Sequence, residues 1–307
     1  MVNPKKITDS KITIIIINWN GVSDTLDCLK SLKKTNYSNL EIIVVDNNSK
    51  DKNEPEIIKS HFPKIQLIKL NSNLGFSGGN NLGIKLALKN NADFIVLLNN
   101  DTVAEPNFLL ETLKYVEDNP DVSIISPLIY TYDQPTKIWF SYGDYYKTFA
   151  SIKAVHKETN FDKEKIYFVS GCCMMLKSKM LKKIGLFDDR FFAYFEDTDL
   201  CIRAKKAGYK ISVAEKAIIY HKISQSSGGV LGPIYLYYMT RNNWLFAQKT
   251  LSWYEWPIFF CFFLFYKTSY PIFKILIKPK KNKFKGFQAI FKGWFDALRG
   301  KYGKANI

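Results

Sequence analysis

Two segments end an apolar run with a carboxylate. Asp46-Asn47-Asn48-Ser49 follows residues 40–45, and its acid can accept hydrogen bonds from a base N–H or a ribose hydroxyl. The same residues also suit a strand-to-helix turn, and the segment alone favours neither interpretation. Asn99-Asn100-Asp101 follows residues 94–98. Mg²⁺ and Mn²⁺ prefer oxygen ligands and share them with substrate phosphates, so Asp101 predicts a divalent-metal site; a turn cap is the alternative.

Three further acids follow an aromatic stretch. Glu196, Asp197 and Asp199 open a helix predicted over residues 197–207, directly after Phe191-Phe-Ala-Tyr-Phe195. The helix dipole favours acids here, and Asp199 suits an i,i+4 pair with Arg203. Placing Glu196 and Asp197 against an aromatic wall costs desolvation, which raises a carboxyl pKa and suits a general base. We therefore predict that Asp197, with Glu196 beside it, is catalytic.

A glycine-rich segment, Asn73-Leu-Gly-Phe-Ser-Gly-Gly-Asn-Asn-Leu-Gly83, precedes a helix expected to begin near Asn80. Backbone amides here, with Asn73, Gly75 and Asn80, can hold a pyrophosphate. The segment lacks a Walker pattern and does not follow the first strand, which argues against a P-loop ATPase and a Rossmann dehydrogenase. A tight turn with amide caps is the structural alternative.

Apolar runs of strand length alternate with helical spacing over the first third of the chain. This alternation predicts a parallel α/β sheet whose strand ends share one ligand crevice, containing Asn18, Asp46, Asn71 and Asn99 to Asp101. The predicted strands are residues 12–17, 40–45, 65–70, 94–98, 122–125, 167–176 and 217–220, and the predicted helices are 23–34, 80–89, 106–119, 178–184 and 197–207. Residues 130–165 predict a long loop or small hairpins.

Together, and in their order along the chain, the four segments resemble family 2 glycosyltransferases of the GT-A fold, over about residues 12–243. The glycine-rich segment, Gly185-Leu-Phe-Asp188 and Arg241-Asn242 are similar to the rhamnosyltransferase-like members. The resemblance implies a Rossmann-like, mixed and mostly parallel sheet flanked by helices. It also implies transfer of a sugar from a nucleotide-sugar donor, with dTDP-rhamnose first and UDP-sugars next, during cell-surface polysaccharide or glycan synthesis.

The resemblance assigns roles to individual residues. Asp46 would contact the nucleoside, Asp101 would be the last acid of a D-x-D metal element, with Asn100 beside it in the donor site, and Asp197 would be the base. Asn99 stands where the first acid of that element would fall, yet it can still ligate Mn²⁺ or Mg²⁺ through its carbonyl or a water. Because no separate nucleophile is apparent, inversion of the anomeric carbon is expected.

Two residues beyond the acids complete the predicted site. His221 follows residues 217–220, and in related enzymes a histidine at such a position can contact the metal or the diphosphate; a structural histidine is the alternative. Arg241 can neutralise the diphosphate leaving group. A salt bridge between the C-terminal region and the core is its alternative interpretation.

The formal net charge is +16, and eleven Lys and Arg residues between Lys267 and Lys304 face the single acid Asp296. Apolar runs at 257–266 and 271–277 are each too short to span a bilayer, so an interfacial or re-entrant hairpin is expected. A basic amphipathic helix follows, with Phe284, Phe287, Phe291, Trp294 and Leu298 on one face. This pattern is typical of an anionic membrane surface, and packing onto the protein is the alternative.

The expected organisation is a catalytic domain over residues 1–230, with donor half 1–101 and acceptor half 102–230, and a membrane-associating region over 231–307. The polar start and five cysteines without C-x-x-C spacing predict reduced thiols on the cytoplasmic side of the membrane. Such an enzyme suits a lipid-linked saccharide acceptor and no nucleic acid, and a homodimer stays open. A sugar-1-phosphate nucleotidyltransferase and a non-catalytic carbohydrate-binding protein are the alternatives; a processive synthase would need several spanning helices.

Overall fold

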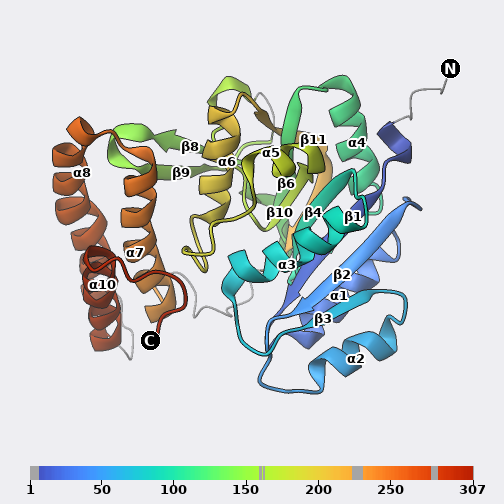
Figure 1. Cartoon of the computed structure of the whole chain (residues 1–307), viewed down its shortest axis with the longest axis horizontal. Coiled ribbons are helices and arrows are strands. Elements are labelled where there is room, and N and C mark those ends of the chain that lie inside the picture. Colours follow the sequence, from blue (N-terminus) through green and yellow to red (C-terminus); the bar gives the residue numbers. More distant parts are fainter. Residues whose placement is uncertain (1–6, 159–160, 162, 223–230, 278–282, 307) are drawn as a thin grey trace.

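The computed structural model describes residues 7–158, 161, 163–222, 231–277 and 283–306 (Figure 1). Its centre is a nine-stranded sheet in the order β3-β2-β1-β4-β10-β6-β11-β5, with β7 paired to β6. The strands of this sheet are β1 (Ile12–Asn18), β2 (Leu40–Asp46), β3 (Gln66–Lys69), β4 (Phe94–Asn99), β5 (Thr102–Ala104), β6 (Val122–Thr131), β7 (Gln134–Phe140), β10 (Cys173–Lys177) and β11 (Lys210–His221).

The donor-side strands confirm the predicted parallel pattern. β1 pairs in parallel with β2 and β4, and in this register Asn18 lies opposite Asp46 while Ile17 lies opposite Asn99. The middle of β1 is completely buried, as expected for a strand covered on both faces. The polar ends of three strands therefore meet at one edge of the sheet.

Helices α1 (Val22–Leu32), α2 (Glu54–His61), α3 (Gly75–Lys89) and α4 (Phe108–Asp118) connect these strands. The predicted start of α3 near Asn80 was wrong, because the helix begins five residues earlier, at Gly75. Its glycines allow the helix to pack closely on the sheet: a Cβ at Gly83 would lie 2.6 Å from Cγ2 of Ile15. Most of the glycine-rich segment is thus a helix–sheet contact.

The second half of the sheet is mixed. β10 runs antiparallel to β4 and β6, while β11 runs parallel to β6 and antiparallel to β5. The strand predicted over 167–176 is shorter, and the irregular stretch contains the hairpin strands β8 (Tyr142–Tyr146) and β9 (Ser151–Val155) besides β7. Helices α5 (Ser178–Ile184) and α6 (Glu196–Lys206) follow, and short 3₁₀ turns occur at Ile7–Asp9, Lys147–Phe149, Lys163–Lys165 and Trp253–Glu255.

Four helices and a π-helical turn form a layer beside this sheet (Figure 1). They are α7 (Pro233–Thr250), α8 (Trp256–Phe262), the turn Phe263–Thr268, α9 (Ser269–Ile277) and α10 (Lys283–Leu298). The expected hairpin was wrong, because residues 253–277 form one continuous helical segment with Lys267 inside the π turn. An 18-residue window of this 25-residue segment has a mean hydropathy of 1.3, so by length and composition alone the segment can cross a membrane.

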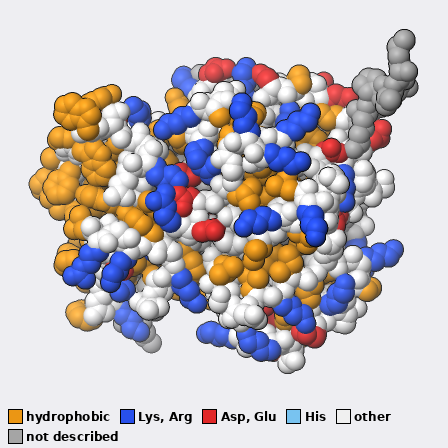
Figure 2. Space-filling model, in the orientation of Figure 1, with side chains coloured by type: hydrophobic (Ala, Val, Ile, Leu, Met, Phe, Trp, Pro, Cys, Tyr) orange, Lys and Arg blue, Asp and Glu red, His pale blue; other side chains and the backbone are white. Residues whose placement is uncertain are grey.

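Helix α10 packs through small side chains. Gly286, Ala289, Gly293 and Ala297 are buried, and a Cβ at Gly293 would lie only 2.8 Å from the Tyr237 carbonyl oxygen of α7. Most of the predicted aromatic stripe therefore does not form the packed face, and Phe284 is 71% exposed. Figure 2 shows hydrophobic side chains gathered over α8 and its neighbours at this end of the molecule.

Candidate active site

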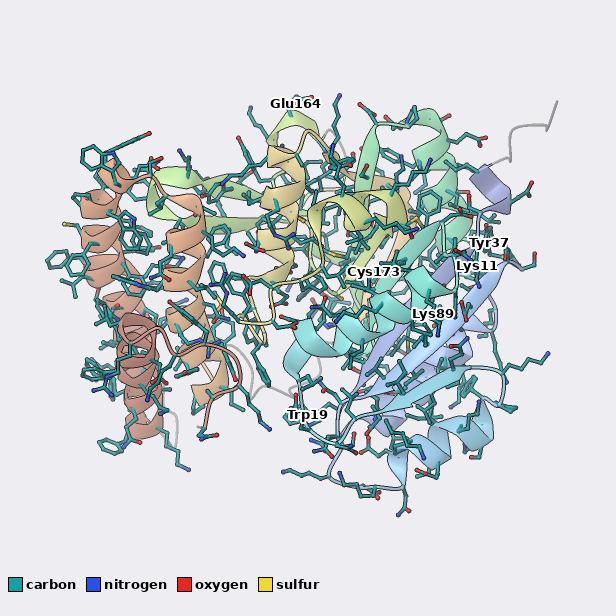
Figure 3. The ribbon with its side chains drawn as sticks, in the orientation of Figure 1. Lys11, Trp19, Tyr37, Lys89, Glu164 and Cys173 are labelled. Carbon is teal, nitrogen blue, oxygen red and sulfur yellow. The ribbon has the colours of Figure 1, made fainter. Side chains whose placement is uncertain are left out.

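A cavity of about 460 Å³ lies beyond the ends of β1 and β4. It is bounded by these strand ends, the start of α3, the segment before α6, helix α7 and the C-terminal tail. Trp19, labelled in Figure 3, is part of its wall. The lining residues are Ile17, Trp19, Asn20, Gly21, Asp24, Asn47, Asn73, Gly75, Phe76, Asn99, Asn100, Asp101, Phe192, Ala193, Tyr194, Ile234, Tyr238, Lys304 and Ala305.

Asn18 and Asp46 support this wall from behind and are not among the lining residues. Asn18 is fully buried, and its Nδ2 donates to Asp46 Oδ1 at 2.9 Å and to Glu54 Oε2 at 2.8 Å. The Ser49 hydroxyl donates to the same Asp46 oxygen at 2.6 Å. This network fixes the ends of β1 and β2 relative to each other. Sequence reasoning missed Glu54, because a buried acid on a short helix carries no motif.

Asn47, which was not singled out from the sequence, joins β2 to the glycine-rich segment. Its Oδ1 accepts from the Leu74 amide at 2.8 Å, and its Nδ2 donates to the Gly75 carbonyl at 2.9 Å. Gly75 has a φ of +74°, and a Cβ there would lie 2.3 Å from the Phe192 carbonyl oxygen. Glycine is therefore required at position 75, both for its backbone conformation and for this contact.

The two asparagines predicted in this segment occupy different places. Asn73 lines the cavity, and its Oδ1 accepts from the Gly75 amide at 2.7 Å. Asn80 is buried inside α3, where its Nδ2 donates to the Phe76 carbonyl at 2.9 Å. The structure thus brings Asn73 and Gly75 to the cavity and leaves Asn80 in the helix–sheet contact.

The residues predicted to bind a metal lie close together at the C-terminal end of β4. His221 lies opposite Thr102 in the β11–β5 register, and its Nε2 lies 3.2 Å from Asp101 Oδ1. The Trp139 ring packs edge-on against the imidazole at a centroid distance of 4.4 Å. Asn99 and Asn100 line the same cavity, and Asn100 donates to Thr25 Oγ1 at 3.1 Å. Residues more than one hundred positions apart thus form one cluster.

This cluster fits a hard divalent ion that completes its shell with phosphate oxygens. It offers a carboxylate, an amide carbonyl and an imidazole, which are suitable ligands for Mn²⁺ or Mg²⁺. The His221 Nδ1 is buried without a hydrogen-bond partner in the described structure. Among the residues that the structure describes, no group of three or more His, Cys, Asp or Glu side chains is placed so that it could hold a metal ion. A bound ion would therefore depend on ligands from the substrate.

The predicted base lies at the start of α6. Asp197 Oδ2 accepts from the Gly171 amide at 2.9 Å, and Oδ1 accepts from the Thr198 amide at 2.6 Å. Burial raises the pKa of Asp197, and these hydrogen bonds oppose the rise. Burial, followed by the charge of Asp197, raises the pKa of Glu196 well above its usual range, and Glu196 Oε2 lacks a hydrogen-bond partner in the described structure.

Gly171 connects Asp197 to the cavity. A Cβ at Gly171 would lie 2.9 Å from Cζ of Phe76, which lines the cavity, and 3.6 Å from Cβ of Asp197. Asp197 and the cavity-lining Phe76 are therefore neighbours on either side of Gly171. The preceding residue, Phe195, has a φ of +74°, a strained conformation that starts α6 at Glu196 and so aims both acids.

Arg241 has a different role from either prediction. It is 1% exposed, it does not line the cavity, and it donates to the backbone carbonyls of Phe191 at 3.0 Å and Gly303 at 2.6 Å. Its guanidinium also stacks over Tyr238, 4.8 Å from the ring centroid. Arg241 therefore joins α7, the segment before α6 and the C-terminal tail through carbonyl oxygens rather than through a salt bridge.

The glycosyl transferase family 2 model matches residues 13–185, which contain the strand ends, the glycine-rich segment and Asp101. The chain belongs to this family. An uncharacterized glycosyltransferase of Methanocaldococcus jannaschii is 26% identical over 89% of this chain and 94% of its own. A dTDP-rhamnosyl transferase of Shigella flexneri is 23% identical over 78% of this chain and 81% of its own. Membership confirms the family predicted from the sequence.

A further relative carries a lipid-linked substrate in its name. An N-acetylglucosaminyl-diphospho-decaprenol L-rhamnosyltransferase of Mycobacterium tuberculosis is 24% identical over 65% of this chain and 72% of its own. Among solved structures, a mannosyltransferase from Pyrobaculum calidifontis with GDP-Man and Mn²⁺ has a TM-score of 0.59, with 12% identity, over 95% of this chain and 88% of its own. GalNAc-T7 with UDP, GalNAc and Mn²⁺ has a TM-score of 0.57, with 14% identity, over 76% of this chain and 48% of its own. These structures confirm the GT-A fold.

Proposed function

We propose that this family 2 glycosyltransferase transfers a hexosyl group, with inversion, from a nucleotide sugar to a saccharide hydroxyl. The observation that carries the proposal is the placement of Asp197: a carboxylate with a raised pKa lies across Gly171 from Phe76, which lines the same cavity as Asp101, and His221 lies 3.2 Å from Asp101. A donor with its diphosphate near Asp101 would present its anomeric carbon toward Asp197. Such a base and such an anion site are the two requirements of a single displacement.

The proposed reaction balances in one step. Asp197 takes the proton of the acceptor hydroxyl, the acceptor oxygen bonds to the anomeric carbon, and the bond from that carbon to the diphosphate oxygen breaks. Because attack and departure occur on opposite faces, the carbon inverts. Mn²⁺ or Mg²⁺ held by Asp101 and His221, with Asn99, would balance charge on the departing diphosphate. Asn47 and Asn73 keep the glycine-rich segment in place at the donor side.

We propose dTDP-rhamnose as the first donor to test, because the Shigella and mycobacterial relatives are named as rhamnosyltransferases, and UDP-sugars as the next. The expected result is that one sugar nucleotide, with Mn²⁺, raises the unfolding temperature of the purified protein and is slowly hydrolysed. Thermal shift over a panel of nucleotide sugars, with and without Mn²⁺, measures this. If every sugar nucleotide left the unfolding temperature unchanged, the proposed donor class would be wrong.

The acceptor proposed is a lipid-linked saccharide. A second cavity, of about 240 Å³, lies between α7 and the apolar helical segment and is lined by Phe195, Asn243, Lys267 and Lys274 among mainly apolar side chains. The Asn243 Oδ1 is buried without a partner in the described structure. Two ammonium groups in such surroundings suit an acceptor phosphate attached to a lipid. Phe195 directly precedes Glu196 and Asp197, so this cavity lies beside the proposed base.

We further propose that residues 1–230 are the catalytic domain, and that residues 231–307, which add part of the cavity wall, also hold it on the cytoplasmic side of an anionic membrane. Phe265 is 73% and Phe273 58% exposed on the apolar helical segment, beside the exposed Phe284. Large exposed apolar patches mark interaction surfaces, and the basic residues of this region suit anionic headgroups. Figure 2 shows the apolar surface concentrated at this end of the molecule.

Changing Phe265 and Phe273 together to glutamate is expected to weaken binding to phosphatidylglycerol vesicles by roughly tenfold or more, because each aromatic ring loses its burial in lipid. Vesicle co-sedimentation measures this. Tyr132→Glu, an exposed aromatic in the β6–β7 turn, is the matched control and should bind like wild type. Equal binding by all three proteins would refute this membrane surface.

A further inference from the structure

The C-terminal tail, residues 303–306, returns to the donor cavity. Figure 1 shows the chain leaving α10 and crossing back over α7. Lys304 and Ala305 line the same cavity as Asn99 and Asp101, although about two hundred residues separate them in the chain. The tail is therefore part of the donor-side wall. Neither a motif nor a periodicity in the sequence indicates this position.

Backbone hydrogen bonds fix the tail in place. The Gly303 carbonyl accepts from Arg241 Nη1 at 2.6 Å, and the Gly303 amide donates to the Arg190 carbonyl at 2.8 Å. The Ala305 amide donates to the Tyr238 hydroxyl at 3.0 Å. These bonds lie on either side of Lys304 and use none of its side chain. The lysine is thus presented by a fixed backbone, while its ammonium group stays free to contact a ligand.

The charges of the cavity wall single out Lys304. Asp24 and Asp101 supply two carboxylates to the wall, and among the described lining residues Lys304 is the one Lys, Arg or His. Asp24 is already paired with Lys222, 3.1 Å away. In the part of the chain that the structure describes, Lys304 makes no ion pair. A diphosphate entering this cavity would find the ammonium group of Lys304 in the same wall as Asp101.

We infer that Lys304 is a donor-binding residue whose ammonium group contacts the diphosphate of the nucleotide sugar, and that Arg241 is the positioning residue that holds its backbone. The inference rests on the proposed nucleotide-sugar donor. A lysine is a strongly hydrated point charge that pairs well with phosphate, and an ammonium in this cavity offsets the repulsion between the diphosphate and Asp101. The sequence analysis predicted this diphosphate contact for Arg241, and the inference assigns it to Lys304, which is 63 positions later in the chain.

Lys304→Gln tests this, because the exposed side chain can lose its charge without disturbing the backbone bonds. Its affinity for dTDP or UDP, whichever stabilises wild type, is expected to fall by roughly tenfold or more, while its affinity for the matching nucleoside stays unchanged. Lys304→Arg should retain most of the diphosphate affinity. Lys301→Gln removes another exposed charge, two residues before the tail and outside the cavity, and should bind like wild type. Isothermal titration calorimetry at two salt concentrations measures the affinity of wild type and the three variants for the nucleoside diphosphate and for the nucleoside.

Three outcomes overturn the inference. They are unchanged dTDP or UDP affinity in Lys304→Gln, equal losses in Lys304→Gln and Lys301→Gln, and equal losses for nucleotide and nucleoside. The second outcome would reveal a general effect of net charge, and the third an effect of cavity shape. Wild type serves as the separate check on the proposed function: if wild type binds no nucleoside diphosphate at all, the proposed donor is wrong, and the comparison between variants fails with it.

Discussion

Asp197→Asn is expected to lower the turnover number for sugar transfer by roughly 10²- to 10⁴-fold, the usual contribution of a general base, while donor affinity changes little. The substitution removes the group that accepts the proton but keeps its size at the start of α6. Donor binding depends on the cavity wall, and Asp197 does not line it. Steady-state transfer kinetics and donor titration measure the two effects separately. Asp118→Asn, an exposed acid at the end of α4, is the control.

The pH dependence provides an independent check. Burial raises the pKa of Asp197 above its ordinary value of 3.8, and only the ionised form accepts a proton. Turnover should therefore fall as the pH drops through this raised pKa, at a higher pH than for an ordinary aspartate. Full turnover in Asp197→Asn, or an acid limb unchanged by that substitution, would contradict the base assignment.

The raised pKa values also affect how stability depends on pH, in the opposite direction from a carboxylate whose pKa is lowered on folding. Because folding raises the pKa of Glu196 and Asp197, the folded state binds their protons more tightly than the unfolded state does. Their contribution is fully favourable below the unfolded pKa and is lost as the pH rises through the folded pKa. At neutral pH an ionised pair at this position therefore costs stability. Such a cost is understandable at a catalytic position and hard to explain for a helix cap.

Local pattern predicted much of the donor side. The run 12–17 is entirely β-branched and the run 94–98 is entirely apolar, which predicts strands. The shared position of their polar ends, Asn18 and Asn99, follows from the parallel-sheet rule. The start of α3 was missed because glycines normally weaken helices, whereas here they permit contact with Ile15. A helix propensity contains no information about such a packing partner.

The rest of the site depends on contacts between distant segments. His221 reaches Asp101 through the β11–β5 pairing, and Lys304 reaches the cavity through the hydrogen bonds of Gly303. Arg241 was predicted to contact a diphosphate or to form a salt bridge, yet it donates to the Asn242 side chain next to it and to backbone carbonyls. Every residue has a backbone carbonyl, so side-chain identity alone could not indicate those partners. Resemblance supplied the role of Asp101, whereas the aromatic wall beside Asp197 could be inferred from local sequence.

Asp101→Asn is expected to weaken nucleotide binding in the presence of Mn²⁺ by roughly 10- to 100-fold, because it removes the carboxylate of the proposed metal cluster. Without metal, the variant and wild type should bind the nucleotide about equally. The reverse change, from amide to carboxylate, is more informative two positions earlier. Asn99→Asp adds a second carboxylate to the proposed metal cluster, besides that of Asp101, so Mn²⁺ should bind more tightly than in wild type.

These two variants separate a metal role from a structural one. A damaged fold would weaken binding in both, whereas a metal site changes in opposite directions as negative charge is removed or added. Electron paramagnetic resonance of free Mn²⁺, with and without nucleotide, reports metal affinity without any need for turnover. Equal Mn²⁺ affinity in wild type, Asp101→Asn and Asn99→Asp would show that His221 and Asp101 form only a structural pair. Tighter binding in Asn99→Asp alone would place the ion at Asn99 and exclude Asp101 as a ligand.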